Sequence, residues 1–411
     1  MSLLSWIYTI VAAGLTFALV WPFVMVVASR FRKPRLEVRM PDARPDFACI
    51  ITAWRNASIA RPLVDSLLRQ RWPHFHIYLV ADRCAPADWT FDDPRLTVLY
   101  PDPPLDLKVK SIIHATERFV RPHDFTLVFD ADNVAHPRLL EELVRYIRAG
   151  WRVVQGQRRA KNLDTVIACA DATGEFYKNY VERYVPFVLG SSAVISGSGM
   201  AVATDLYRGY LHSPEIRRGK ELGKRMMQED KILQNWLLRR DERIAWAREA
   251  IVYDEKVTTP DAARTQRSRW LFSYFQNVPH AAGLLWLGLR RRSWNQFLFG
   301  LVTLLPPLFL TVGSAALWAL AGLWVAPLWS LVLTAALAIF ALNVLWTLWL
   351  TPVPPAVWKA LWGLPLFIWQ QVRALFLMKN PDRNFAPTRH QHEVDVEALL
   401  ANDPTHEKES S

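Results

Sequence analysis

Long apolar runs lie near both ends of this chain, and its charged residues are concentrated between them. Residues 3–28 contain no charged side chain, and about 20 apolar residues suffice to cross a bilayer as a helix. Two more apolar runs, residues 296–324 and 328–350, follow the charged middle. The sequence therefore predicts three transmembrane helices with a folded domain of ordinary size between the first and the second.

Basic residues beside these runs indicate the orientation of the chain. Arg30, Arg32 and Lys33 follow the first run, and three consecutive arginines, 290–292, precede the second. Because basic flanks stay on the cytosolic side, we expect the N-terminus outside and the middle domain in the cytosol, in a bacterial inner membrane. Ten of the 19 tryptophans lie beyond residue 285, and the net charge is +11. Both features fit contact with membrane lipids.

A further apolar stretch, residues 356–378, is interrupted by polar and charged side chains such as Lys359 and Arg373. We interpret it as an interfacial helix, with a transmembrane helix as the alternative. In this interpretation residues 276–295 also lie at the interface, and residues 379–411 form a cytosolic tail.

Residues 46–275 alternate between strand-like and helical patterns, which predicts a mostly parallel sheet covered by helices. The strand-like runs are residues 47–52, 76–82, 95–100, 125–132 and 151–157. Helical stretches at about 109–119 and 138–148 separate the later runs.

Two carboxylates, Asp130 and Asp132, end the strand-like run 125–132. Side chains two residues apart in an extended chain point the same way, and open α/β sheets bind ligands at this edge. Like charges held so close repel one another unless a cation joins them, and a hard divalent ion with free sites for phosphate oxygens would do so. The pattern indicates a metal and phosphate site, with a solvated turn as the alternative.

Acidic residues at two other places could contribute to the same site. Asp82 ends the run 76–82 and could accept hydrogen bonds from a nucleobase or ribose, or could simply cap a turn. Glu229 and Asp230 begin an amphipathic helical run. An acid there could act as a general base toward a hydroxyl group, or could only complement the helix dipole.

The segment QRSRW, residues 266–270, has the spacing of one helix face, which would hold Gln266, Arg269 and Trp270. Arginine binds phosphate through paired hydrogen bonds, and tryptophan stacks on sugars. These residues therefore favour a sugar and diphosphate site, with a membrane-proximal amphipathic helix as the alternative.

In chain order, these residues resemble the D, DxD, ED and QxxRW motifs of the membrane-bound family 2 glycosyltransferases. Cellulose, chitin, hyaluronan and poly-N-acetylglucosamine synthases and ceramide glucosyltransferase belong to that family. The resemblance covers residues 46–275 and implies a GT-A-type α/β domain. It also implies a UDP-sugar donor, a Mn²⁺ or Mg²⁺ ion, and a lipid or polysaccharide acceptor.

The resemblance implies a role for each matching residue. Asp230 would be the catalytic base, and Asp130 and Asp132 would hold the metal and the diphosphate. The other implied donor-binding residues are Thr52, Ala53, Asn56, Asp82, Lys108 and Arg269. The other implied acceptor-binding residues are Gly197, Ser198, Gly199, Glu229, Gln266 and Trp270. Leu107 stands where the family has a glycine before its lysine, and residues 52–56 lack the family's acid.

Three functions follow as hypotheses. The leading one is transfer of a sugar, with inversion, to a growing polysaccharide or another membrane-associated acceptor. The first alternative is single glycosylation of a lipid such as a ceramide, a hopanoid or a polyprenyl phosphate, which the short membrane region favours. The second is a non-catalytic membrane scaffold or a nucleic-acid-binding protein. The retained acids argue against a scaffold, and the lack of aromatics among the basic runs argues against nucleic acid as a partner.

Overall fold

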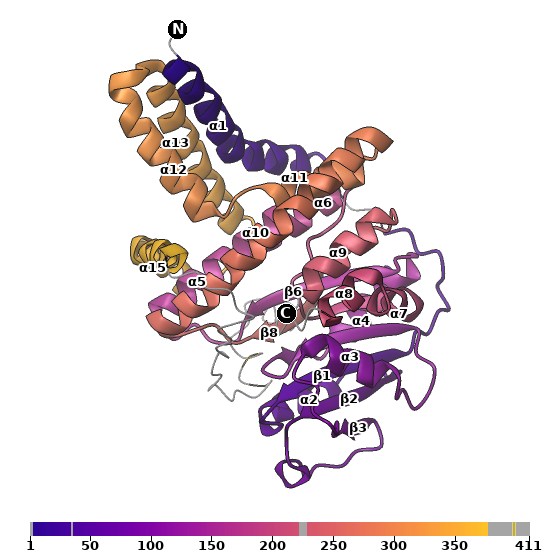
Figure 1. The fold of residues 1–411 in the computed structure, drawn as a ribbon. Coiled ribbons are helices and arrows are strands. Elements are labelled where there is room, and N and C mark those ends of the chain that lie inside the picture. The colour runs from indigo at the N-terminus through magenta and orange to yellow at the C-terminus, as the bar shows by residue number, and fades with distance from the viewer. Residues whose placement is uncertain (1–2, 34–35, 222–227, 377–396, 398, 400–411) are drawn as a thin grey trace, which may run out of the picture.

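The computed structural model describes residues 3–33, 36–221, 228–376, 397 and 399. Eight strands form one mixed sheet with helices packed on it, and a group of long apolar helices extends away from this domain (Figure 1). Among the described residues, three helices are long and apolar enough to cross a membrane. The expected fold class, an α/β domain flanked by apolar helices, is confirmed.

The order of the sheet is β3-β2-β1-β4-β7-β6-β8-β5. The strands are β1 (Phe47–Trp54), β2 (Phe75–Asp82), β3 (Leu96–Leu99), β4 (Phe125–Asp130), β5 (Val134–Ala135), β6 (Val153–Ala160), β7 (Met200–Ala203) and β8 (Ala245–Asp254). Strands β3, β2, β1 and β4 are mutually parallel, whereas β7 is antiparallel to both of its neighbours. Every strand-like run expected from the sequence lies in this sheet. Strands β5, β7 and β8 were not predicted.

Strands β1 and β2 are buried on both faces, which explains their nearly continuous apolar sequences. Helices cover both faces, and α4 shows why they pack there: Leu139, Leu143 and Ile147 lie four residues apart on one buried stripe. The helices of this domain are α2 (Arg61–Leu68), α3 (Lys108–Thr116), α4 (Leu139–Arg148), α5 (Val166–Lys178), α6 (Val185–Val188), α7 (Thr204–Leu211), α8 (Pro214–Glu221) and α9 (Glu229–Arg239). A π-helical turn, η3 (Asn179–Tyr184), joins α5 to α6.

The register of the parallel strands brings their polar ends together. Thr52 of β1 pairs with Asp130 of β4, and Trp54 of β1 pairs with Asp82 of β2. Because parallel strands present their carboxyl ends at one edge, these residues share the edge at which such sheets bind ligands.

A 32-residue helix, α10 (Pro260–Arg291), leads from the sheet toward the apolar helices. It contains the QRSRW segment, so the domain boundary that we expected at residue 275 falls inside one helix. The segment expected as a span over residues 296–324 is also divided. It forms α11 (Trp294–Leu304) and α12 (Leu308–Val325). Pro306 and Pro307 separate them, because proline lacks the N–H donor that a helix interior needs.

The three candidate spans are α1 (Leu3–Arg30), α12 and α13 (Pro327–Trp349). They pack together through a small core that includes Tyr8, Leu19, Ala315 and Leu333. Residues 356–376 form α14 (Pro355–Lys359), a short turn, and α15 (Leu364–Phe376). Most of the expected tail, residues 379–411, lies outside the described residues.

Candidate functional site

A cavity of about 1660 Å³ extends from the carboxyl edge of the parallel strands to the apolar helices. It collects nearly all of the residues that the sequence indicated. Its lining includes Thr52, Ala53, Asn56, Asp82, Lys108, Asp130, Asp132, Gly197, Glu229, Asp230, Gln266, Arg269 and Trp270. These residues come from segments more than 200 positions apart, and the fold places them around a single volume.

Ser198 and Gly199 are not among the residues that line this cavity. Ser198 is 1% exposed, and the Gly199 N–H donates to the carbonyl of Val128 in the sheet. Gly199 has a φ of +65°, and a Cβ there would meet the Val252 side chain at 2.6 Å. A glycine is therefore required at 199 for packing, rather than for contact with a ligand.

Lys108 links the carboxylates at the entrance of the cavity. Its Nζ lies 2.6 Å from Oδ1 of Asp130 and 3.3 Å from Oε1 of Glu229. Burial alone would lower the pKa of Lys108, but these two carboxylates raise it above its ordinary value. Burial is also the main reason why the pKa of Glu229 is raised. Lys108 is therefore a fixed positive charge next to the predicted diphosphate position.

Asp82 has a structural role in this arrangement. Its two carboxylate oxygens accept hydrogen bonds from the backbone N–H groups of Leu105 and Asp106, at 3.0 and 2.7 Å. Asp106 in turn accepts hydrogen bonds from Arg83 and Trp54, and these bonds lower the pKa of Asp106 to about 2. Asp82 thus fixes the loop that precedes Lys108.

Asp230 also lines the cavity, at the start of α9. Its Oδ1 accepts a hydrogen bond from the backbone N–H of Lys231. Its Oδ2 accepts none from a described residue and lies 3.8 Å from the place that a Cβ at residue 197 would occupy. Gly197 has a φ of +91°, so a glycine both permits this turn and keeps the space beside the carboxylate open. The carboxylate is placed to accept a proton from a group in the cavity.

One face of α10 forms part of the cavity wall, as the spacing of the residues in segment 266–270 predicted. Gln266, Arg269 and Trp270 all line the cavity, and Oε1 of Gln266 is buried without a hydrogen-bond partner among the residues that the structure describes. Burial lowers the pKa of Arg269. An orphaned amide oxygen and a partly desolvated guanidinium are suited to a polar ligand.

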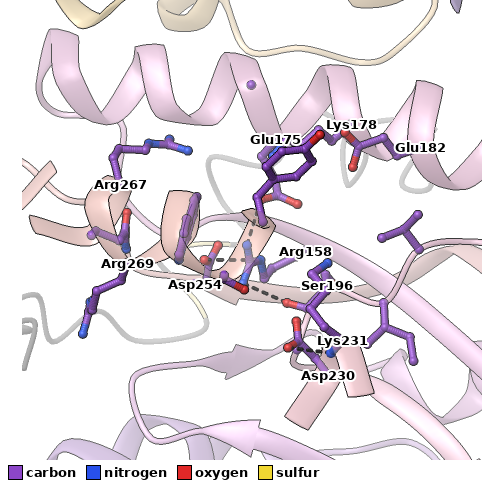
Figure 2. Close-up of a pocket in the computed structure, with 18 of the residues that line it drawn as sticks. Arg158, Glu175, Lys178, Glu182, Ser196, Asp230, Lys231, Asp254, Arg267 and Arg269 are labelled. Carbon is purple, nitrogen blue, oxygen red and sulfur yellow. Dashed lines mark hydrogen bonds and ion pairs between the residues drawn. The ribbon is translucent and has the colours of Figure 1, made fainter. Parts of the chain in front are cut away.

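A buried charge network, not foreseen from the sequence, supports this wall (Figure 2). Arg158 contacts Glu175 at 2.9 Å and Asp254 at 3.4 Å, and Arg183 and Lys256 also reach Glu175. These residues come from β6, α5, η3, β8 and the loop after β8, and no local pattern in the sequence brings them together. The cations keep Glu175 charged, with a pKa well below its ordinary value although burial opposes this.

The carboxylates that line the cavity are suited to a metal ion only if a bound ligand also coordinates that ion. Among the described residues, no group of three or more His, Cys, Asp and Glu side chains could hold an ion. Asp130 and Asp132 offer hard oxygen ligands at the strand end, and an ion with only two protein carboxylates takes its other ligands from phosphate or water. The donor set therefore fits a divalent ion carried together with a diphosphate.

One comparison with a solved structure agrees with this fold. Among solved structures, a mannosyltransferase from Pyrobaculum calidifontis, determined with GDP-Man and Mn²⁺, is 13% identical with a TM-score of 0.51. The match covers 91% of this chain and 100% of that one. Residues 1–349 of S. aureus TarS, solved with UDP, are 14% identical over 73% of this chain and 89% of that one, with a TM-score of 0.36.

No curated protein sequence matches the chain. The model of one family, described as "Glycosyltransferase like family 2", matches residues 45–273, the segment that contains the sheet and the polar half of the cavity. The chain is therefore a glycosyltransferase and belongs to family 2.

Proposed function

We propose that this chain transfers a sugar, with inversion and with a divalent metal ion, from a nucleoside diphosphate sugar to a hydroxyl group of a membrane lipid. UDP-sugar is the donor that the motif resemblance implies. The observation that carries the proposal is the shape of the cavity. One volume is lined both by Asp130, Asp132 and Asp230 and by apolar side chains of α1, α12 and α13.

The donor would bind at the strand edge. Thr52, Ala53 and Asn56 would contact the nucleoside, and Lys108 would contact the diphosphate. The metal ion, Mn²⁺ or Mg²⁺, would be held by Asp130 and Asp132 and would neutralise charge on the leaving diphosphate. Arg269 reaches the same volume from α10 and adds positive charge there.

The acceptor hydroxyl would lie next to Asp230. As its oxygen bonds to the anomeric carbon, the bond from that carbon to the diphosphate oxygen breaks on the opposite face. The bonding electrons leave with the nucleoside diphosphate, and the hydroxyl proton passes to Asp230. Trp270 and Gln266, on the α10 face, would position the sugar.

The apolar part of the cavity favours a lipid over a polysaccharide as acceptor. A sugar polymer needs hydrogen-bond partners along its path, and an apolar lining offers few. The lining residues that α1, α12 and α13 contribute are Trp21, Pro22, Met25, Leu308, Phe309, Val312, Phe340 and Val344.

The Asp230→Asn variant tests the mechanism. Asparagine keeps the shape of the residue but cannot accept the proton, so the transfer rate should fall by about 10² to 10⁴. Donor affinity, measured by calorimetry with the UDP-sugar and Mn²⁺, should not change. Asp205→Asn is the matched control, because Asp205 is also in the first turn of a helix but lies outside the cavity. A normal transfer rate in Asp230→Asn would refute the assignment of Asp230 as the catalytic base. Glu229 would then be the next residue to test.

A further inference from the structure

Two lysines line the cavity between Asp230 and the apolar side chains. Lys178 is the last residue of α5, and Lys231 follows Asp230 in α9. Figure 2 shows them on opposite walls, with Lys178 on the long helix and Lys231 beside Asp230. They lie near enough that the charge of Lys178 contributes to the pKa of Lys231. The two ammonium groups therefore act on one part of the cavity.

These lysines differ from the other cations around the cavity. Arg158, Arg183 and Lys256 each contact Glu175, and Lys108 contacts Asp130. By contrast, the ammonium group of neither Lys178 nor Lys231 takes part in an ion pair or hydrogen bond in the part of the chain that the structure describes, and Lys231 bonds to Asp230 only through its backbone N–H. Both side chains are half-buried.

The groups around Lys231 do not offset the unfavourable effect of burial on its positive charge. Burial lowers the pKa of Lys231, and the nearby carboxylates of Asp230 and Glu182 do not restore it to the ordinary value. A partly desolvated cation without a partner is unfavourable. An anion that entered the cavity would remove this penalty, because a charge-assisted hydrogen bond is stronger than a neutral one.

Apolar side chains adjoin this position on the membrane side. Tyr177 precedes Lys178 in α5, Val181 lies three residues after it in η3, and both line the cavity. Further apolar lining residues come from the ends of α1, α12 and α13 that are nearest to the catalytic domain (Figure 1), and others come from helices such as α11 and α15. A ligand with a negatively charged group next to a hydrocarbon chain would match this part of the cavity.

We propose that Lys178 and Lys231 bind a phosphate group of the acceptor, which is a lipid that carries a free hydroxyl beyond that phosphate. The phosphate lies between the lysines, the hydrocarbon chains lie among the inner ends of the candidate spans, and the hydroxyl reaches Asp230. Because Lys231 follows Asp230 directly, the hydroxyl and the phosphate are separated by about one small polyol or one sugar. The inference rests on the proposed function and specifies its acceptor.

Binding to the full chain in an uncharged detergent tests this inference by calorimetry. The probes are short-chain phosphatidylglycerol, diacylglycerol with the same chains, and inorganic phosphate. We expect phosphatidylglycerol to bind, and diacylglycerol and inorganic phosphate to bind more weakly by an order of magnitude or more. If inorganic phosphate binds as tightly as phosphatidylglycerol, the proposal that the ligand is a lipid is wrong. If diacylglycerol binds as tightly, the proposal that the lysines contact a phosphate is wrong.

Lysine variants identify the site. Lys178→Gln and Lys231→Gln should each weaken phosphatidylglycerol binding on the order of tenfold, whereas Lys178→Arg and Lys231→Arg should keep most of it. Lys110→Gln and Lys220→Gln are exposed controls. UDP with Mn²⁺ is titrated into every sample. Failure of the wild type to bind UDP would count against the proposed function. Normal UDP binding with lipid affinity unchanged in both glutamine variants would overturn the inference alone.

Discussion

The Nζ atom of Lys108 lies 2.6 Å from Oδ1 of Asp130, one of the two carboxylates that we assign to the donor and metal site. Lys108 owes this position to the loop before it, whose backbone N–H groups are held by Asp82. Without a donor the lysine neutralises the carboxylates, and with a donor it can contact the diphosphate. We therefore expect Asp82 to affect donor binding through Lys108.

Replacing Lys108 by methionine should weaken UDP binding by about tenfold or more, because a charge-assisted contact contributes roughly 1.5–3 kcal/mol. Calorimetric titration of UDP in the presence of Mn²⁺ measures the effect. Lys110→Met is the matched control, since Lys110 lies on the same helix and is exposed. Equal UDP affinity in the two variants would show that Lys108 does not contact the donor.

The metal assignment predicts that Asp132→Ala loses Mn²⁺ binding in the presence of UDP. Electron paramagnetic resonance of Mn²⁺ measures the bound fraction directly, without relying on activity. Asp65→Ala, on α2 and outside the cavity, is the control. In the wild type, excess EDTA should abolish sugar transfer, and added Mn²⁺ should restore it. Full transfer in EDTA would contradict the assignment.

The sequence predicted the site best where function and local pattern coincide. Asp82, Asp130 and Asp132 follow apolar strands, and parallel strands place their ends at one edge, so their convergence was foreseeable. Helical spacing likewise placed Gln266, Arg269 and Trp270 on one face. Lys231 was visible within the Glu229-Asp230 segment, but its position toward the cavity depends on the packing of α9.

The sequence failed where long-range packing decides the structure. Strand β7 is only four residues long, and β8 pairs with β6, which lies about 90 residues earlier in the chain. Nothing local to Arg158 or Glu175 indicates that they meet. Pro306 and Pro307 were visible in the sequence, but uniform hydrophobicity around them masked the break between α11 and α12.

The buried network predicts a large loss of stability in Glu175→Gln. The substitution leaves Arg158, Arg183 and Lys256 around a neutral amide, and removing one partner of a buried ion pair costs about 3–5 kcal/mol. The free energy of unfolding in detergent should fall by about that amount. Glu117→Gln, at an exposed position, should change it by less than about 0.5 kcal/mol. Similar values for the two variants would mean that the network contributes little.

Lowering the pH should also reveal the contribution of Glu175 and its cations to the stability of the fold. The pKa of Glu175 is lowered well below its ordinary value of 4.5 in the folded chain, where cations outweigh the opposing effect of burial. This stabilisation is therefore complete above pH 4.5 and disappears as the pH falls through the lower folded pKa. Below pH 4.5 the wild type should lose stability more steeply than Glu175→Gln. Parallel pH curves would contradict this.

The last prediction concerns the side of the membrane on which the chain ends. Within the residues that the structure describes, helix α15 covers 13 residues, about 20 Å, which is less than a hydrocarbon core of about 30 Å. Leu399 packs against Val134 of the catalytic domain, and Glu397 pairs with Arg69. A tail beyond a fourth span could not make these contacts.

Reporter fusions measure this directly. A reporter that is active only in the periplasm should be inactive after residue 411 and after Arg292, and active after Ala326, in the turn between α12 and α13. The fusion after Ala326 is the positive control, because α12 begins on the cytosolic side in the proposed orientation. Activity after residue 411, with the other two fusions as expected, would mean that residues 356–378 cross the membrane. The contacts of Glu397 and Leu399 with the catalytic domain would then be impossible in the membrane-inserted protein.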